Sequence, residues 1–478
     1  MYDIAIIGCG ITGAATAYYL SRYNLKCIII EKDNDVCNAT TKANSAIIHA
    51  GYDPKPGTLM ARLNVSGSIL AKEICQRLNV AYKQIGSLVV AFSPEELDTI
   101  HKLKSRGEQN GVKGLEIISA QRLREMEPNI SEKALGALYA PTAAVVDPWD
   151  YGLAMAEVAV KNGCALSLNS EVTGLSKKDD IWQIHTKRSV IEAKYVINAA
   201  GVFADKIHNM AARKAYKILP NAGEYYLLDK SEGKRVNHIV FQCPGPEGKG
   251  VLVSPTVHGN LIVGPNAESR YDEPENVKCT ADGLSIVKEK AVKSVPSIVF
   301  RENIRNFCGI RANSDADDFV IFESTKGFID AGGIKSPGLS AAPAIAKYII
   351  ELLKQSGLEL TEKDNFDDTR SVVRFASLTP EEKNELIKKR PDYGRVICRC
   401  ETITQGEIID ALNCVIPPCS IDGIKRRTGS GMGRCQGGFC GPKILDLIAK
   451  HKGVEPCEVL QDKNNSYILT GETKAGGR

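Results

Sequence analysis

The 478-residue sequence is 43% hydrophobic and 25% charged, an ordinary globular composition that excludes a disordered, collagen-like or very small protein. Its 61 basic and 57 acidic residues leave a net charge of only +4, which indicates no preference for nucleic acid or a membrane surface. The length suffices for about three domains. The 15 cysteines are unevenly distributed, with eight in residues 1–393 and seven in residues 394–478.

The first residues, MYDIAIIGCG, show no secretory leader, and no apolar run approaches the ~18–20 residues of a membrane span. We therefore expect a cytoplasmic protein with no transmembrane segment. In that reducing setting, clustered cysteines indicate metal or redox sites rather than disulfides.

Residues 3–8 have the pattern of an apolar strand, which runs into Gly8, Gly10 and Gly13 and then a helix-like segment. A second apolar strand ends at Glu31, 18 residues after Gly13. In this motif the glycines allow a tight turn, close approach of a pyrophosphate and close helix packing, while the acidic residue binds ribose hydroxyls. The sequence therefore predicts a dinucleotide site at the helix N-terminus, whose partial positive charge favours the pyrophosphate. This motif alone does not separate FAD from NAD.

Two later segments bear on which dinucleotide binds. Residues 194–205 (KYVINAAGVFAD) have a strand pattern followed by small residues, and residues 327–353 have the pattern of a strand, a glycine turn and a helix. Together with the N-terminal motif, these segments resemble the FAD-binding parts of the D-amino-acid-oxidase superfamily. Residues 1–393 contain no C-x-x-C, which argues against a disulfide-reductase flavoprotein.

The segments between the FAD-binding parts predict a substrate-binding half. Residues 223–267 alternate short β-type runs with Gly, Pro and Asn turns, which indicates an antiparallel sheet. Residues 40–67, 223–267 and 304–311 resemble the glycerol-3-phosphate oxidase and dehydrogenase branch of the superfamily, and less closely L-2-hydroxyglutarate dehydrogenase. The resemblance covers most of residues 1–356.

The resemblance implies active-site roles for four residues. His49 corresponds to the active-site histidine, Arg311 to the anion-binding arginine, and Lys249 and Ser336 to further substrate-pocket positions. Histidine has a pKa suited to accepting an alcohol proton, and arginine can bind a phosphate through two hydrogen bonds. Arg311 and Lys249 together would balance a phosphate better than one cation would, which favours glycerol 3-phosphate over a monocarboxylate.

The resemblance also implies FAD-binding residues beyond the dinucleotide motif. The Ser-Pro-Gly turn at 336–338 would point a helix N-terminus at the flavin, where positive potential stabilises the anionic reduced ring. The implied FAD-binding residues are Ile11, Thr12, Lys32, Thr41, Asn44, Ser45, Val172, Ala200, Gly201, Gly333, Lys335, Gly338 and Leu339.

A charged, proline-containing linker with one amphipathic helix is expected before the cysteine-rich tail. In the tail, Thr404 and Glu407 have the spacing of a capping box that opens a helix. A second helix is expected between Ser420 and Gly429, and a third with Pro442 in its first turn. The tail is therefore predicted to be a small helical domain whose cysteines lie in loops.

Two metal centres are considered for the tail. Cys398 and Cys400 form C-x-C, Cys435 and Cys440 form C-x4-C, and 34 residues separate the pairs. Zinc fingers and ribbons usually space both pairs C-x2–4-C, whereas the nearby glycines would let backbone N–H groups turn toward the sulfurs of an iron–sulfur cluster. The spacing and the opening CRCE resemble the bacterioferritin-associated-ferredoxin-like [2Fe–2S] domain, which implies these four cysteines as ligands. In that family, the domain is found fused behind anaerobic-type glycerol-3-phosphate dehydrogenases.

Other tail residues are given supporting roles. Cys414, Cys419 and Cys457 do not match ligand positions and are expected to be buried thiols. Basic side chains are expected to offset the negative charge of the cluster, namely those of Arg399, Lys425, Arg426, Arg427, Arg434 and Lys443.

We therefore expect an α/β chain with a Rossmann-like FAD-binding domain, an inserted antiparallel-sheet substrate domain and a small helical C-terminal iron–sulfur domain. The FAD-dependent oxidoreductase spans residues 1–356, with FAD-binding parts at about 1–80, 145–215 and 325–356 and substrate-binding parts at about 81–144 and 216–324. The linker spans 357–393, the [2Fe–2S] domain 394–455 and a final tail 456–478.

The expected function is an FAD-dependent dehydrogenase that oxidises sn-glycerol 3-phosphate to dihydroxyacetone phosphate. Electrons would pass through the [2Fe–2S] cluster to an electron-accepting protein or a second flavoprotein subunit. An attached cluster favours a dehydrogenase over an oxidase that is reoxidised directly by oxygen. Two alternatives stay open: a flavoprotein that acts on a 2-hydroxy acid or an amine, and a zinc-bound scaffold subunit of a larger complex.

Overall fold

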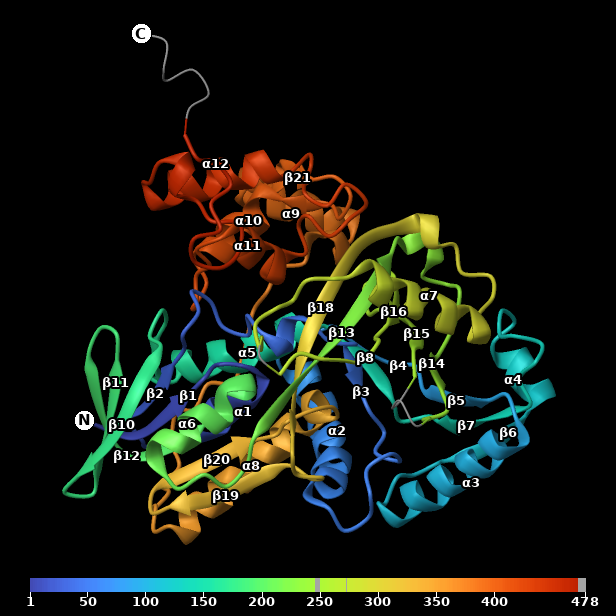
Figure 1. Cartoon of the computed structure of the whole chain (residues 1–478). Helices are drawn as coiled ribbons and strands as arrows, with labels where there is room; N and C mark the ends of the chain where they lie inside the picture. The colour runs from blue at the N-terminus through green and yellow to red at the C-terminus, as the bar shows by residue number, and fades with distance from the viewer. Residues whose placement is uncertain (246–249, 272, 472–478) are drawn as a thin grey trace.

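The computed structural model describes residues 1–245, 250–271 and 273–471. Figure 1 shows two sheets with their helices and, above them, a small helical domain formed by the C-terminal residues. The predicted α/β class, with a Rossmann-like part and a helical C-terminal domain, is confirmed. Within the described residues, no helix is both long and apolar enough to cross a membrane.

The first sheet contains the N-terminal strand. Its order is β10 (Val172–Lys178), β11 (Ile181–Thr186), β12 (Val190–Asn198), β1 (Tyr2–Ile7), β2 (Cys27–Ile30) and β9 (Ala165–Ser167). The end of β12 also pairs in parallel with β20 (Phe328–Gly332), which pairs antiparallel with β19 (Val320–Thr325). The carboxyl ends of parallel strands β1, β2, β12 and β20 therefore meet at one edge, where dinucleotide sites of this architecture lie.

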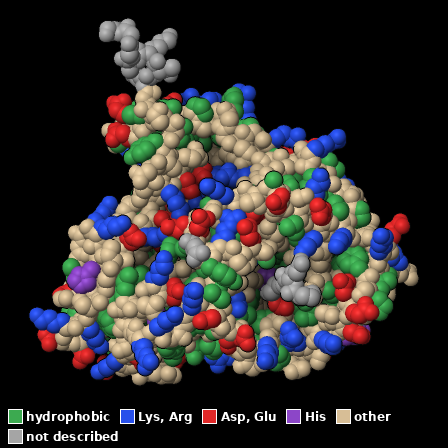
Figure 2. Space-filling model, viewed as in Figure 1, with side chains coloured by type: hydrophobic (Ala, Val, Ile, Leu, Met, Phe, Trp, Pro, Cys, Tyr) green, Lys and Arg blue, Asp and Glu red, His purple; other side chains and the backbone are tan. Residues whose placement is uncertain are grey.

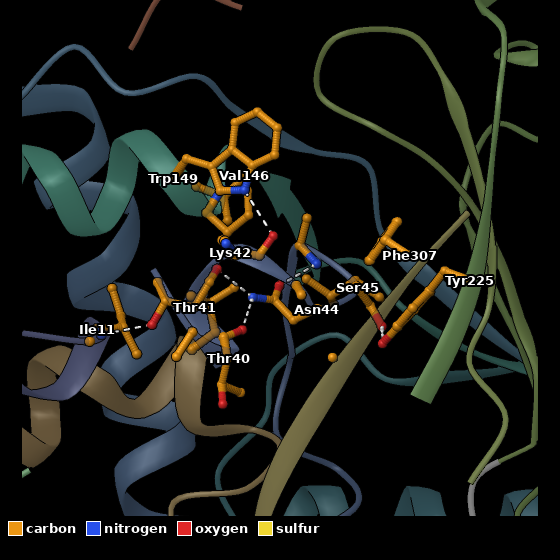
Figure 3. Close-up of a pocket in the computed structure, with 18 of the residues that line it drawn as sticks. Ile11, Thr40, Thr41, Lys42, Asn44, Ser45, Val146, Trp149, Tyr225 and Phe307 are labelled. Carbon is orange, nitrogen blue, oxygen red and sulfur yellow. Dashed lines mark hydrogen bonds between the residues drawn. The ribbon is translucent and has the colours of Figure 1, made fainter. Parts of the chain in front are cut away.

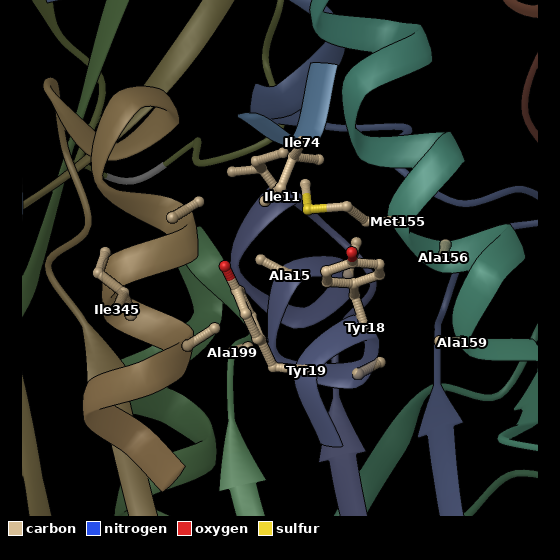
Figure 4. Packing of buried hydrophobic residues seen from close by; sticks show 14 of the residues in the cluster. Ile11, Ala15, Tyr18, Tyr19, Ile74, Met155, Ala156, Ala159, Ala199 and Ile345 are labelled. Carbon is tan, nitrogen blue, oxygen red and sulfur yellow. The ribbon is translucent and has the colours of Figure 1, made fainter. Parts of the chain in front are cut away.

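Helix α1 (Ile11–Leu20) is central to the first hydrophobic core (Figure 4). All ten of its residues are buried, and it packs between α5 (Pro148–Lys161) and α8 (Gly338–Gln355). Helix α2 (Leu59–Arg77) packs on α8 so closely that a Cβ at Gly67 would lie 2.4 Å from the carbonyl oxygen of Ser340. Helix α6 (Ala204–Ala211) follows β12. These contacts place the ends of the three predicted FAD-binding segments side by side.

The second sheet is almost entirely antiparallel. Its order is β17 (Glu268–Ser269), β13 (Ile218–Leu228), β16 (Leu261–Gly264), β15 (Leu252–Pro255), β14 (Ile239–Gln242), β5 (Ser87–Ala91), β7 (Gly136–Ala140) and β6 (Glu116–Ser119), and β18 (Asn303–Ser314) also pairs with β13. Among the described strands of this sheet, β14 and β5 are the one parallel pair, and β5 comes from an earlier segment of the chain than β14.

Three helices pack against the second sheet. A smaller sheet lies where the parts of the molecule built on the first and second sheets meet. The helices are α3 (Pro94–Gln109), α4 (Ala120–Met126) and α7 (Ala281–Ser294). The smaller sheet has the order β3 (Ile47–Ile48), β8 (Ala144–Val146) and β4 (Tyr82–Gln84). Because β3 directly precedes His49, this small sheet positions a predicted catalytic residue.

The C-terminal domain contains the three predicted helices. Its elements are β21 (Val396–Cys398), β22 (Ile403–Thr404), α10 (Gln405–Leu412), α11 (Ile421–Thr428) and α12 (Gly441–Lys452). The capping box of Thr404 and Glu407 is confirmed, and Gly429 ends α11 with a φ of +80°. The predicted linker helix also forms, as α9 (Pro380–Lys389), with none of its residues buried.

The linker residues before α9 are fixed to helix α5 by ion pairs. The Arg370 side chain is only 8% exposed and forms ion pairs with Asp150 at 2.7 Å and Glu157 at 2.6 Å, both on α5. Arg374 pairs with Asp150 at 2.6 Å. The segment between the oxidoreductase part and the cysteine-rich domain is therefore bound to the first half of the molecule.

Candidate functional site

The turn between β1 and the N-terminus of α1 forms a site that can bind an anion. Gly8 has a φ of +96°, and a Cβ there would lie 2.6 Å from the carbonyl oxygen of Ala199. A Cβ at Gly13 would lie 2.0 Å from the carbonyl oxygen of Gly8, whereas one at Gly10 would meet only the Thr41 hydroxyl, at 3.4 Å. Helix α1 begins with no side-chain cap and no acidic residue in its first turn. The helix N-terminus is therefore available to a pyrophosphate, and the site fits a dinucleotide.

Glu31 forms one side of this turn. Its Oε2 accepts a hydrogen bond from the backbone N–H of Cys9 at 2.7 Å, and its Oε1 accepts one from Asp33 at 2.9 Å. Burial raises the pKa of Glu31, and these two N–H groups oppose the rise. Glu31 lines the cavity beside Lys32 and Val172. Its binding of ribose hydroxyls stays a prediction.

The loop after β2 forms the wall of the cavity between the sheets (Figure 3). The Thr41 hydroxyl accepts the backbone N–H of Ile11 at 2.9 Å, and Asn44 Nδ2 donates to the carbonyl oxygen of Thr41 at 2.8 Å. From α5, Trp149 Nε1 donates to the carbonyl oxygen of Lys42 at 2.9 Å. These bonds fix the loop to both α1 and α5.

Arg311 lies on β18 directly opposite Asn221 of β13. Its guanidinium donates to Asn221 Oδ1 at 2.6 Å and to the carbonyl oxygens of Ala222 at 3.2 Å and Asn266 at 3.1 Å. A Cβ at Gly223 would lie 2.4 Å from Arg311 Nη2, so glycine is needed for the guanidinium to lie across β13. These acceptors are all uncharged, which leaves the positive charge for an anion in the cavity.

Tyr225 belongs to the same site, and the sequence reasoning missed it. Its hydroxyl lies 3.1 Å from that of Ser45, and its ring stacks on Phe307 with centroids 4.7 Å apart (Figure 3). Burial raises the pKa of Tyr225, and Arg311 opposes the rise. The strand alternation is the one signal that could have found it, since residues 221, 223 and 225 share a face of β13.

His49 is held from three sides. Its backbone N–H donates to the Ser340 hydroxyl at 2.8 Å, and its carbonyl oxygen accepts from Asn64 Nδ2 at 3.2 Å. Its ring stacks on Phe241 of the second sheet, with centroids 5.8 Å apart. Residues of α8, α2 and β14 thus fix the position of His49, which lines the same cavity as Arg311.

The structure brings most of the predicted site residues to one continuous cavity of about 3630 Å³. Gly13 and Gly333 do not line it: Gly13 packs on Gly8, and a Cβ at Gly333 would meet the Ser314 hydroxyl at 2.7 Å. Lys249 lies outside the described residues. The predicted residues that line the cavity are Gly8, Gly10, Ile11, Thr12, Glu31, Lys32, Thr41, Asn44, Ser45, His49, Val172, Ala200, Gly201, Arg311, Lys335, Ser336, Gly338 and Leu339. Their individual roles stay predictions.

The four predicted cysteine ligands meet in the C-terminal domain as two pairs. Cys398 and Cys440 are buried and hydrogen-bonded to each other, while Cys400 and Cys435 are exposed with their sulfurs 3.8 Å apart. Among the described residues, no three His, Cys, Asp or Glu side chains are arranged to hold a single metal ion. Four cysteines brought together as two pairs suit the two irons of a [2Fe–2S] cluster.

Backbone N–H groups point at these sulfurs, as predicted from the glycine-rich loop. Hydrogen bonds from the Cys440 thiol and from the backbone N–H groups of Gly431 and Glu401 lower the pKa of Cys398 to about 6, and the shared proton raises the pKa of Cys440. The N–H of Phe439 lowers the pKa of Cys435. Because metal ligation needs thiolates, the backbone N–H donors suit a cluster site, whereas Cys440 would give up its proton as a ligand itself.

The prediction that six basic residues offset the cluster charge is wrong for four of them, because these four pair with carboxylates instead. Arg426 and Arg427 are buried against Asp35 in the loop after β2, and Lys425 is buried against Asp422 of α11 itself. Arg434 is exposed and pairs with two carboxylates of the second half. Arg399 and Lys443 do lie in or beside the cysteine segments, against Phe439. The expectation that Cys457 is buried is also wrong, since it is exposed.

Asp35, in the loop after β2, is the centre of the contact between the first sheet and the C-terminal domain. Arg426 and Arg427 both donate to its carboxylate at 2.9 Å. Asp35 is 2% exposed and each arginine 5%. Asp462 accepts from Arg426 at 2.7 Å and pairs with Lys42 at 2.5 Å, and Figure 2 shows charged side chains gathered beneath the C-terminal domain.

The variant Asp35→Asn is expected to lose about 3–5 kcal/mol of the free energy that holds the C-terminal domain in place, because it leaves the buried charge of Arg427 without a carboxylate partner, while Arg426 keeps only Asp462. Burial alone would raise the pKa of Asp35, but Arg427 and Arg426 hold it below its ordinary value. The wild-type contact therefore persists at neutral pH and is lost only as the pH falls below about 4. Calorimetry would detect a separate unfolding transition at lower temperature in the variant at pH 7.

The control Asp33→Asn removes a partly exposed pair with Lys463 and should cost less than about 1 kcal/mol of the same free energy.

Comparison with known proteins places the chain in a family. It matches the family model "FAD dependent oxidoreductase" over residues 3–352, the part that contains both sheets and the cavity. The chain belongs to the FAD dependent oxidoreductase family. Residues 396–450 match the "BFD-like [2Fe-2S] binding domain", the part that holds the two cysteine pairs. The predicted cofactors, FAD and a [2Fe–2S] cluster, are therefore confirmed.

Several relatives of this FAD dependent oxidoreductase have assigned activities. It is 48% identical to "Glycerol 3-phosphate dehydrogenase" of Caloramator mitchellensis over 478 residues, 99% of each chain. It is 33% identical to "Glycerol 3-phosphate oxidase" of Mycoplasma genitalium over 375 residues, 76% of this chain and 97% of that one. The solved L-alpha-glycerophosphate oxidase of Mycoplasma pneumoniae with FAD bound superposes with a TM-score of 0.74 at 31% identity, covering 78% of this chain and 99% of that one.

Proposed function

We propose that this FAD-dependent oxidoreductase oxidises the C2 hydroxyl of glycerol 3-phosphate to the ketone of dihydroxyacetone phosphate, with its electrons leaving to an acceptor outside the chain. The observation that carries the proposal is the guanidinium of Arg311, which is bonded to uncharged acceptors and lies in the cavity that His49 and the FAD-binding loops also line. The 48% identity to a glycerol 3-phosphate dehydrogenase along 99% of both chains supports the same substrate.

In this proposal, different side chains of the cavity bind the phosphate and accept the hydroxyl proton. Arg311 binds the phosphate through its outward N–H groups, because its other donors are fixed to Asn221 and to backbone carbonyls. Tyr225 lies beside it and restricts where the phosphate can lie. His49 accepts the proton of the C2 hydroxyl, and its fixed backbone and stacked ring keep the imidazole in place. When bound, FAD accepts the hydride equivalent and the cluster accepts electrons one at a time.

The test is anaerobic mixing of the FAD-loaded protein with candidate substrates. The flavin absorbance should be lost after mixing with glycerol 3-phosphate. It should be retained after mixing with 2-hydroxyglutarate, sarcosine or D-amino acids. Bleaching by one of those three instead, with none by glycerol 3-phosphate, would overturn the proposed substrate.

The variant Cys435→Ser should show that substrate oxidation by the flavin does not require the cluster through which electrons leave the chain. It removes one ligand of the exposed cysteine pair, so iron and sulfide contents should fall to less than about a tenth of the wild-type values. Glycerol 3-phosphate should still bleach the flavin, because Cys435 does not line the cavity. The control Cys457→Ser changes an exposed cysteine outside the pairs and should keep both cofactors. Loss of flavin bleaching in Cys435→Ser would contradict this division.

A further inference from the structure

The two irons of a bound cluster would differ in their access to solvent. The ligands Cys398 and Cys440 are buried, whereas Cys400 and Cys435 are exposed. A protein acceptor can approach the cluster closely only where the chain leaves its ligands open. The side of the cluster at Cys400 and Cys435 is therefore the accessible side.

An aromatic ring lies in the same ligand loop. Phe439, between Cys435 and Cys440 in sequence, is 41% exposed. The Arg399 guanidinium lies 4.5 Å from the centroid of its ring, and Lys443 Nζ lies 4.3 Å from it. An exposed aromatic side chain fixed by neighbouring cations is typical of an anchor at a protein interface.

Basic side chains outnumber acidic ones in the two segments around this ring. In residues 395–401 and 433–443, the only acidic residue is Glu401, which pairs with Lys230 at 2.6 Å. Arg434 is likewise neutralised, by Asp229 at 3.0 Å and Glu302 at 3.0 Å. In the part of the chain that the structure describes, Arg399 and Lys443 make no ion pair, and the same holds for Arg395, which donates to Gln405. Three cations are thus left without a carboxylate partner.

We propose that this surface, formed by Cys400, Cys435, Phe439, Arg399 and Lys443, is the docking site of an acidic protein that accepts single electrons from the cluster. The inference rests on the proposed function, in which electrons leave the chain, and adds where they leave and what kind of partner takes them. These cations, which have no carboxylate partner among the described residues, favour a partner of negative charge and steer its approach, while Phe439 provides a central apolar contact.

The experiment uses the complete protein with both cofactors, reduced by dithionite and freed of excess reductant. Two oxidised haem proteins serve as probes: cytochrome b5, which is acidic, and cytochrome c, which is basic. Stopped-flow absorbance follows haem reduction and cluster reoxidation at low and high salt. The wild-type protein should reduce cytochrome b5 more slowly as salt is added, and cytochrome c should not show this dependence.

Two variants test the surface directly. Lys443→Glu should lower the second-order rate constant for cytochrome b5 about tenfold at low salt and raise that for cytochrome c. Glutamate is favourable in the first turn of α12, so the helix should form normally. Phe439→Ala should slow the reduction of cytochrome b5 while leaving the salt dependence of that rate unchanged. The control Lys178→Glu makes the same charge change on β10, at the far edge of the first sheet, and should leave both rates within about twofold.

The outcomes separate this inference from the proposed function. Equal rates for Lys443→Glu and wild type, with iron and sulfide contents matched, would overturn the docking surface. Dithionite supplies the electrons, so the result does not depend on which substrate the cavity binds. Failure of glycerol 3-phosphate to bleach the flavin would overturn the proposed function and leave this measurement valid.

Discussion

The variant Arg311→Met is expected to lower kcat/KM for glycerol 3-phosphate by about 10²–10³-fold. It removes one partner of a partly buried, charge-assisted contact, a loss of about 2–5 kcal/mol. The phosphate is bound both before and during the reaction, so most of the loss should appear as a higher KM, with a smaller change in kcat. Steady-state kinetics with a small electron acceptor would measure both constants.

Two comparisons make this result specific to the phosphate. Arg311→Lys keeps the charge but loses the two-pronged hydrogen-bonding geometry, so its kcat/KM should lie between those of wild type and Arg311→Met. Glycerol lacks the phosphate, so its slow oxidation should be nearly equal in the wild type and both variants. An equal loss with glycerol and glycerol 3-phosphate would assign Arg311 a structural role instead.

The variant Gly8→Ala is expected to be purified without FAD. Its Cβ would lie 2.6 Å from the carbonyl oxygen of Ala199, so β1 and the end of β12 would have to separate at the dinucleotide turn. Gly8 also has a φ of +96°, which costs an alanine about 1–2 kcal/mol. Flavin absorbance of the purified protein and titration of the FAD-free protein should show at least a tenfold weaker affinity, about 1.4 kcal/mol or more.

Gly57→Ala is the matched control for this variant. Gly57 has a φ of +85°, and a Cβ there would have no atom within 4 Å. The control therefore carries the conformational cost without the collision and should keep its FAD. Equal FAD loss in both variants would show that backbone strain, rather than the close approach of Ala199, is responsible.

Features that depend on neighbouring residues in the chain were predictable from the sequence. The glycine turn at 8–13, the capping box of Thr404 and Glu407, and the stop of α11 at Gly429 each follow from local backbone chemistry. The two cysteine pairs were recognisable by their spacing for the same reason. Each of these signals lies within a few residues, where hydrogen-bonding geometry and steric limits determine the structure.

Features that depend on strand register or domain contact were not predictable. Arg311 faces Asn221 only because β13 and β18 pair in one register, and this register also brings Tyr225 to the site. Arg426 and Arg427 were assigned to the cluster because they are close to it in sequence. Their partner Asp35 lies almost 400 residues earlier, and no local pattern identifies such a contact.

The ion pairs of Asp35 also set an order of assembly. The ribosome makes Asp35 near the start of synthesis, but its counter-ions Arg426 and Arg427 only near the end. Until then the loop after β2 cannot bury this carboxylate, because an unpaired charge in the interior is strongly unfavourable. That loop begins next to Glu31 and leads to Thr41 in the cavity wall. The C-terminal domain can therefore bind this loop only after translation has nearly ended, whereas the cavity wall at Thr41 is fixed earlier by its own bonds to α1 and α5.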